Sequence, residues 1–261
     1  MKVRANGIAI EYDLTGDGEA VTLIHALGLD RQSWWRQVPE LEADYRVLRY
    51  DVRGHGQTDN PAGPYSIAML AEDLRALLAE LQIGKTHVVG LSMGGMIAQA
   101  FALSHPEMVI SLVLCDTSSG HTEAQRRTFY ERARLVEREG MEPLVAPTLE
   151  RWLTPPFRAA NHEIGERIAQ TLRHNDPRGY AASCGAVGDL ALTGQLGRIT
   201  CPTMVVVGEK DAGTPPEMAR VIQAGIPGAR LEVIPAAAHL VPVEKAERFN
   251  ALLQEFLVRA R

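Results

Sequence analysis

A serine flanked by glycines follows a run of β-branched residues and directly precedes a helix-forming segment. The chain reads Gly90-Leu91-Ser92-Met93-Gly94 at this point. A strand-to-helix turn this sharp closes only if the positions two before and two after the serine lack side chains. It exposes the serine hydroxyl at a helix N-terminus, where backbone N–H groups and the helix dipole favour developing negative charge. The pattern therefore predicts a nucleophilic serine suited to acyl transfer.

A serine hydroxyl becomes a good nucleophile only when an imidazole takes its proton, and an acid must orient that imidazole. The predicted strand 203–207 runs into Asp211, and the predicted strand 231–234 runs into His239. Both side chains thus follow the carboxyl ends of strands, where ligands bind in open parallel sheets. The order serine, acid, histidine also fits a nucleophile elbow of this kind. We predict that Asp211 is the orienting acid and His239 the general base for Ser92.

Other roles and other carboxylates compete with this assignment. Asp211 can instead cap the helix that follows it. Glu209 lies in the same loop, and Asp116 follows a predicted strand that ends at Cys115. Asp116 is the stronger alternative acid, because it also stands at the carboxyl end of a strand.

An oxyanion hole needs two backbone N–H groups aimed at one point. We expect one from Met93, directly after the nucleophile, and the other from Leu27, in the loop after an early strand. His25 in that loop is interpreted as a brace rather than a proton-transfer group, because His239 already fills the latter role. The segment 51–56 lacks the spacing of a phosphate loop or a metal site and is interpreted as a tight turn.

The elements that must position these residues alternate between strands and helices, which predicts a mostly parallel sheet covered on both faces, an α/β fold. Asn6-Gly7 is a hairpin signal, so the sheet is expected to open with an antiparallel ribbon. The expected strands lie near 8–14, 21–25, 46–51, 86–90, 110–115, 203–207 and 231–234, and the expected helices near 32–43, 66–82, 93–104, 216–224 and 245–259.

The alternation stops between about Ser118 and Gln195, where helical stretches rich in arginine and glutamate are broken by prolines. We predict a core domain formed by residues 1–117 and 196–261, with a helical cap, or lid, inserted at 118–195. Such a lid would exclude water and shape the pocket.

Composition points to small-molecule chemistry. The 261 residues carry a net charge of -5 with a pI near 5.9, which gives no electrostatic reason to expect nucleic acid or an anionic membrane as a partner. The N-terminus has no apolar stretch of signal-peptide length, and no run is long enough to span a bilayer. We expect a cytoplasmic protein without metal or cofactor and leave open whether it forms a homo-oligomer.

Several segments together resemble the α/β-hydrolase superfamily over nearly the whole chain: residues 25–28, 49–56, 90–95, 208–211 and 238–239. Within it, further segments look like the bacterial 3-oxoadipate enol-lactonases: residues 48–56, 63–65, 90–96, 151–155, 176–177 and 179–180. The resemblance implies hydrolysis of a small enol-lactone that carries a carboxylate, in a β-ketoadipate-type route of aromatic degradation.

On this resemblance, Trp152 and Trp34 are candidates for packing against the substrate, with ordinary core packing as the competing interpretation. Arg151 is the candidate for holding a substrate carboxylate. Other cap arginines have glutamates three or four positions away and are interpreted as surface pairs, namely Arg127, Arg134 and Arg138.

The same motifs occur with other substrates, because fold and triad do not determine the substrate. A general carboxylesterase, a homoserine-lactone hydrolase and a cofactor-free perhydrolase therefore remain alternatives. Dehalogenases and epoxide hydrolases are excluded, since their elbow nucleophile is an aspartate and position 92 is serine. A ligand receptor on this fold and a purely structural module are weaker alternatives, since backbone strain at an elbow normally persists for a use.

Overall fold

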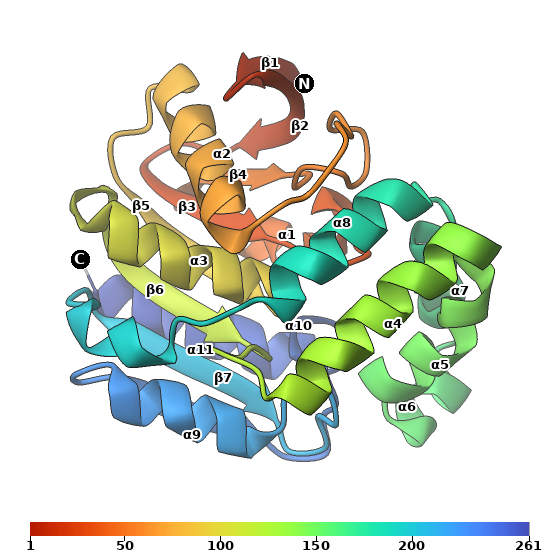
Figure 1. Cartoon of the computed structure of the whole chain (residues 1–261). Helices are drawn as coiled ribbons and strands as arrows, with labels where there is room; N and C mark the ends of the chain where they lie inside the picture. The colour runs from red at the N-terminus through yellow and green to blue at the C-terminus, as the bar shows by residue number, and fades with distance from the viewer. Residues whose placement is uncertain (261) are drawn as a thin grey trace.

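A computed structural model describes residues 1–260 as a three-layer α/β structure around one eight-stranded sheet (Figure 1). The strand order is β1-β2-β4-β3-β5-β6-β7-β8, and only the pairs β1/β2 and β2/β4 are antiparallel. This confirms the α/β prediction and the antiparallel ribbon, whose turn places Asn6 and Gly7 at positive φ. The strands are β1 (Lys2–Ala5), β2 (Ile8–Thr15), β3 (Glu19–Ile24), β4 (Tyr45–Tyr50), β5 (Thr86–Leu91), β6 (Val109–Cys115), β7 (Thr203–Gly208) and β8 (Arg230–Ile234).

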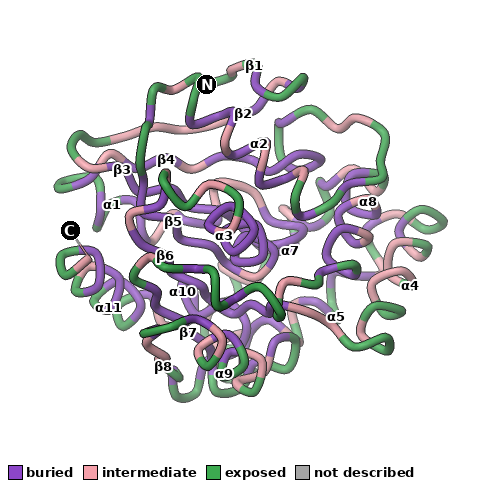
Figure 2. Tube along the Cα trace, turned by 60° about the vertical axis from the view of Figure 1, so that its left-hand side comes forward, coloured by how far each residue is buried: buried purple, intermediate pink, exposed green. Residues whose placement is uncertain are grey.

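The central strands are buried on both faces, which explains their continuous apolar runs (Figure 2). Because side chains alternate along a strand, neighbouring residues enter different cores. One core joins Val88 and Leu114 to helices α2 (Ile67–Glu80), α3 (Met93–Ser104) and α9 (Pro216–Gly225). The other joins Val89 and Val113 to α1 (Val38–Leu41) and α11 (Ala246–Arg259).

The prediction of one helix near 32–43 was wrong in extent. The structure has a 3-10 turn, Arg31–Trp34, and then the short α1. Pro39 lacks the N–H that a continuous helix would use, which accounts for part of the break. The Gln37 amide also bonds the Pro242 carbonyl and the Asn250 side chain, so this segment is held by α11 and by the short helix before it, α10 (Val241–Glu244).

The predicted cap segment 118–195 contains α4 (Glu123–Glu139), α5 (Glu142–Trp152), α6 (Pro155–Ala160), α7 (His162–Arg173) and α8 (Pro177–Gly188). Figure 1 shows these helices gathered at one end of the sheet, beyond α3 and α10 (Val241–Glu244). A Thr122–Gln125 capping box begins α4. An isolated bridge, Gly120 to Ala191, joins the two chain segments that enter and leave the cap. The division into core and cap domains stays a prediction.

No helix among residues 1–260 is both long and apolar enough to cross a membrane.

Candidate active site

The Ser92 turn has the strained geometry that its flanking glycines predicted. Ser92 lies between β5 and α3 with φ 54° and ψ -114°, a region that L-residues rarely occupy. A Cβ on Gly90 would overlap the Gly94 carbonyl, and a Cβ on Gly94 would overlap the Ile24 carbonyl. The Ser92 N–H is held by the Cys115 carbonyl at 2.9 Å. The turn therefore requires both glycines, and it leaves Ser92 half-buried at the N-terminus of α3.

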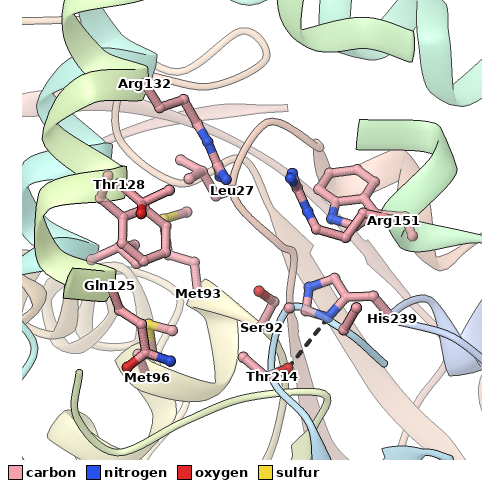
Figure 3. A pocket seen from close by; sticks show the side chains of 15 residues that line it. Leu27, Ser92, Met93, Met96, Gln125, Thr128, Arg132, Arg151, Thr214 and His239 are labelled. Atoms are coloured by element: carbon pink, nitrogen blue, oxygen red, sulfur yellow. Dashed lines mark hydrogen bonds between the residues drawn. The ribbon is translucent and has the colours of Figure 1, made fainter. Parts of the chain in front are cut away.

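Asp211 and His239 meet at the same end of the sheet. The His239 Nδ1 atom lies 2.7 Å from Asp211 Oδ2, and both side chains are almost fully buried. The other carboxylate oxygen of Asp211 accepts the N–H groups of Gly213 and Thr214 at 2.8 and 3.0 Å. These two N–H groups lie in the loop before α9, whose N-cap Pro215 has no side-chain cap bond, so Asp211 does not cap that helix. Figure 3 shows His239 beside Ser92, with the Thr214 hydroxyl 3.3 Å from His239 Nδ1.

Each partner of this pair favours the charged form of the other. Burial opposes ionisation of Asp211, but the charge of His239 and hydrogen bonds from His239 and Thr214 lower the pKa of Asp211 to about 2. Burial also disfavours the imidazolium, yet Asp211 and the charge of Asp116 outweigh it and raise the pKa of His239. An imidazole of raised pKa next to a permanent carboxylate is suited to taking and returning a proton.

The two alternative acids make other contacts. Asp116 is fully buried, and its oxygens accept the N–H groups of Gly208 at 2.9 Å and Val241 at 3.1 Å. Glu209 is an exposed residue that accepts the Ala236 N–H at 3.1 Å. Neither carboxylate forms a hydrogen bond to an imidazole, so the geometry favours Asp211 as the partner of His239.

The loop with the second expected oxyanion donor is held by two buried histidines. His55 Nε2 accepts the Gly28 N–H at 3.0 Å, directly after Leu27. His25 Nε2 accepts the Val52 N–H at 2.9 Å, and its Nδ1 lies 2.8 Å from the Ala26 carbonyl. These contacts agree with the interpretation of His25 as a brace and give segment 51–56 a role in holding the loop.

Ser92, His239, Leu27 and Met93 line one cavity of about 240 Å³ between the sheet end and the cap. Cap residues Arg132 and Arg151 complete it, and Figure 3 shows their side chains extending from α4 and α5 toward its interior. No Asp or Glu of residues 1–260 lines the cavity, and within this range neither arginine forms an ion pair with a carboxylate. Burial and the nearby Arg132 lower the pKa of Arg151.

Three cap or loop residues were expected to touch the substrate, and the structure places two of them in the cavity. Trp152 lines the cavity and stacks on His239 with a ring-centroid distance of 5.9 Å. Arg151 also lines it. Trp34 does not: its side chain is fully buried against Phe249, which is the core-packing alternative.

Arg132 was missed by sequence reasoning, although a signal existed. It has no acidic residue three or four positions away, unlike Arg127, Arg134 and Arg138 on the same helix. An arginine without a local partner is a candidate for a functional contact.

Within residues 1–260 no group of three or more His, Cys, Asp or Glu side chains is arranged to hold a metal ion.

Comparison with known proteins shows the family to which the chain belongs. The family description "alpha/beta hydrolase fold" matches residues 19–139. A curated relative, 3-oxoadipate enol-lactonase 2 of Acinetobacter baylyi, is 33% identical over 98% of this chain and 95% of its own length. The chain belongs to the α/β-hydrolase family.

Two solved α/β-hydrolases extend the comparison to three dimensions. The enol-lactonase from Burkholderia xenovorans LB400 has a TM-score of 0.96 and 31% identity, covering 99% of this chain and all of its own. A thermophilic esterase from Thermogutta terrifontis has a TM-score of 0.94 and 32% identity, covering 100% of this chain and 98% of its own. This α/β-hydrolase is thus an enzyme of the hydrolase class, and its relatives include proteins named as enol-lactonases and as an esterase.

Proposed function

We propose that the protein is a serine hydrolase that opens a small, carboxylate-bearing enol-lactone, 3-oxoadipate enol-lactone, in a β-ketoadipate-type route. One observation carries the proposal: the cavity that contains Ser92 and His239 also contains Arg132 and Arg151 and no acidic side chain among the described residues. An electrophilic ester and a negative charge on one small molecule match these two halves of the cavity.

In the first step Ser92 Oγ attacks the lactone carbonyl carbon, and His239 Nε2 takes the hydroxyl proton. Asp211 holds the imidazole through Nδ1 and stabilises the imidazolium. The N–H of Met93 is the first of α3, so no earlier carbonyl of that helix accepts it, and it is free to bind the oxyanion. The Leu27 N–H is the proposed second donor.

Collapse of the tetrahedral intermediate breaks the ring C–O bond. The ring oxygen leaves as an enol after receiving the proton from His239, and it becomes a ketone by tautomerisation. The acyl group stays on Ser92 as an ester. His239 then deprotonates a water molecule, which attacks this ester, and the Ser92 oxygen leaves with the returned proton. The product is the keto acid with a second carboxylate.

The charge and the size of the cavity support this choice of substrate class. Arginine forks bind carboxylates with paired hydrogen bonds, and Arg132 and Arg151 approach the cavity from different cap helices. A volume of about 240 Å³ suits a small substrate. Two relatives named above are enol-lactonases, which agrees with this choice.

The proposal is tested by measuring hydrolysis of 3-oxoadipate enol-lactone and of p-nitrophenyl acetate, with Ser92→Ala as the blank. We expect a kcat/KM for the lactone above about 10⁵ M⁻¹s⁻¹, an ordinary efficiency for a true substrate, and far above that for the ester. Weak lactone hydrolysis beside clear Ser92-dependent ester cleavage would discard the lactonase and keep the serine hydrolase.

A general carboxylesterase is the second candidate, since an esterase shares the fold at nearly the same TM-score. It would hydrolyse neutral esters at least as well as the anionic lactone, and neutralising the two arginines would not reduce its activity.

A further inference from the structure

Asp116 is a buried carboxyl group close enough to Asp211 and His239 to interact with their charges, and the reaction described above does not use it. It follows β6, is fully buried and adopts φ 45°, in the left-handed region that non-glycine residues rarely occupy. Its backbone N–H is bonded to the Val206 carbonyl of β7 at 2.9 Å. A strained, buried acid of this kind costs stability and persists only when its surroundings hold it in place.

The carboxyl group of Asp116 joins the two loops that carry the acid and the base. Oδ1 accepts the N–H of Gly208, three residues before Asp211, at 2.9 Å. Oδ2 accepts the N–H of Val241, two residues after His239, at 3.1 Å. The segment before Asp211 and the segment after His239 are therefore bonded to different oxygens of the same side chain.

Other contacts hold the His239 loop on its remaining sides. The Ala238 N–H is bonded to Glu244 Oε2 at 3.0 Å, and the Leu240 N–H to the Trp152 carbonyl at 3.2 Å. These bonds tie the loop to α10 and to the cap. The Lys210 N–H also bonds the Ala237 carbonyl at 2.8 Å and joins the two loops directly. Asp116 adds a second link, from the end of the strand before Asp211 to the residue two after His239.

The charged and titratable groups facing Asp116 are Asp211, His239 and the Cys115 thiol, whose Sγ lies 3.2 Å from Oδ2. Arg151 and Asp211 also face His239. Burial, and after it the charge of Asp211, raise the pKa of Asp116, so its ionised form is costly. Two backbone N–H groups and the thiol donate to its oxygens, which suits a carboxylate, because that group only accepts hydrogen bonds.

We propose that Asp116 is a positioning residue: its carboxylate fixes the Asp211 loop and the His239 loop at the separation that the acid–base pair requires. The inference rests on the proposed function, in which Asp211 orients His239. It assigns Asp116 no contact with substrate, and so differs from the alternative in which Asp116 is itself the triad acid.

Asp116→Asn tests the proposal with almost no change in size. An amide accepts hydrogen bonds only at its oxygen, so one of the two loop N–H groups would face an NH₂ donor. We expect kcat for p-nitrophenyl acetate to fall about ten- to a hundredfold through misplacement of the base, with KM unchanged within about twofold. Asp211→Asn should cost more, because it removes the partner of the imidazole itself.

Proton NMR supplies a readout that loss of packing alone would not move. The His239 Nδ1 proton, bonded to Asp211, is expected as a low-field resonance that is absent in His239→Gln. It should shift or broaden in Asp116→Asn. Asp73→Asn is the matched control, because Asp73 is an equally buried carboxylate that is bonded to Arg53 and Asn6 instead.

The proposal is supported if Asp116→Asn shows both the loss of kcat and the displaced His239 resonance. Asp73→Asn must show neither change at a comparable loss of melting temperature. Any other combination overturns the proposal. Asp116→Ser replaces the asparagine variant under the same criteria if that variant does not fold. Failure of the proposed function would be distinguishable: the lactone would then be hydrolysed weakly while Ser92-dependent ester cleavage remained, and kcat for that ester and the NMR comparison would still decide the role of Asp116.

Discussion

The sheet end and the cap contribute to the cavity in different ways. At the sheet end Asp211 and His239 are buried and bonded to each other, and backbone contacts hold their loops. From the cap, Arg132 and Arg151 reach the cavity without a carboxylate partner among the described residues. The proposed reactive groups are thus fixed by the fold, whereas the groups proposed to select the substrate are side chains on helices. This explains how relatives with the same fold can be named for different esters.

The largest effect is expected from the sheet end. Ser92→Ala and His239→Ala should each lower kcat at least about a thousandfold for every substrate, because a triad acts as a unit. The measurement is kcat on the lactone and on p-nitrophenyl acetate, with circular dichroism to verify folding. Near-normal turnover of either substrate by a folded variant would exclude the mechanism.

Smaller and selective effects are expected from the cap. Arg132→Met and Arg151→Met should each reduce kcat/KM for the anionic lactone about ten- to a hundredfold, since a hydrogen bond to a charged group contributes about 1.5–3 kcal/mol. Hydrolysis of neutral p-nitrophenyl acetate should change less than about threefold. Equal losses on both substrates would place the arginines in the chemistry rather than in selection.

With a neutral ester as the substrate, the pH dependence of kcat/KM should reflect the titration of groups at the sheet end and not of the cap arginines. His239 acts as a base only when neutral, and its pKa is raised above the ordinary 6.5. The kcat/KM should therefore fall about tenfold per pH unit below a midpoint above 6.5. Asp211, with a pKa near 2, stays ionised throughout this range. A midpoint below 6.5 would contradict the coupling of His239 to Asp211, the carboxylate bonded to its Nδ1.

Sequence patterns predicted the sheet end better than the cap, for a physical reason. Gly90 is required by the local geometry of the elbow, and Asp211 and His239 follow neighbouring strands of the parallel part of the sheet. Contacts between distant segments leave no such local pattern. The interpretation of Trp34 as a substrate contact therefore failed, because its packing against Phe249 could not be seen in the sequence.

The same limit applies to the buried polar contacts of the core. Nothing near Asp116 in the sequence shows that its oxygens bind Gly208 and Val241, which lie 92 and 125 positions away. The broken helix near 32–43 likewise depends on contacts with Pro242 and Asn250. Tertiary hydrogen bonds decide these features, and a single sequence records only the residues that form them.

The smallest effect is expected from an exposed arginine on the same helix as Arg132. Arg127 and Arg132 both belong to α4, but Arg127 is 73% exposed and pairs with Glu123 at 3.7 Å, one turn away. Arg127→Met should change the free energy of unfolding by no more than about 0.5 kcal/mol, because exposed ion pairs contribute little. It should also leave kcat/KM for the lactone unchanged. If Arg127→Met reduced lactone hydrolysis as much as Arg132→Met, the general positive charge of the cap, rather than two arginines aimed into the cavity, would attract the substrate.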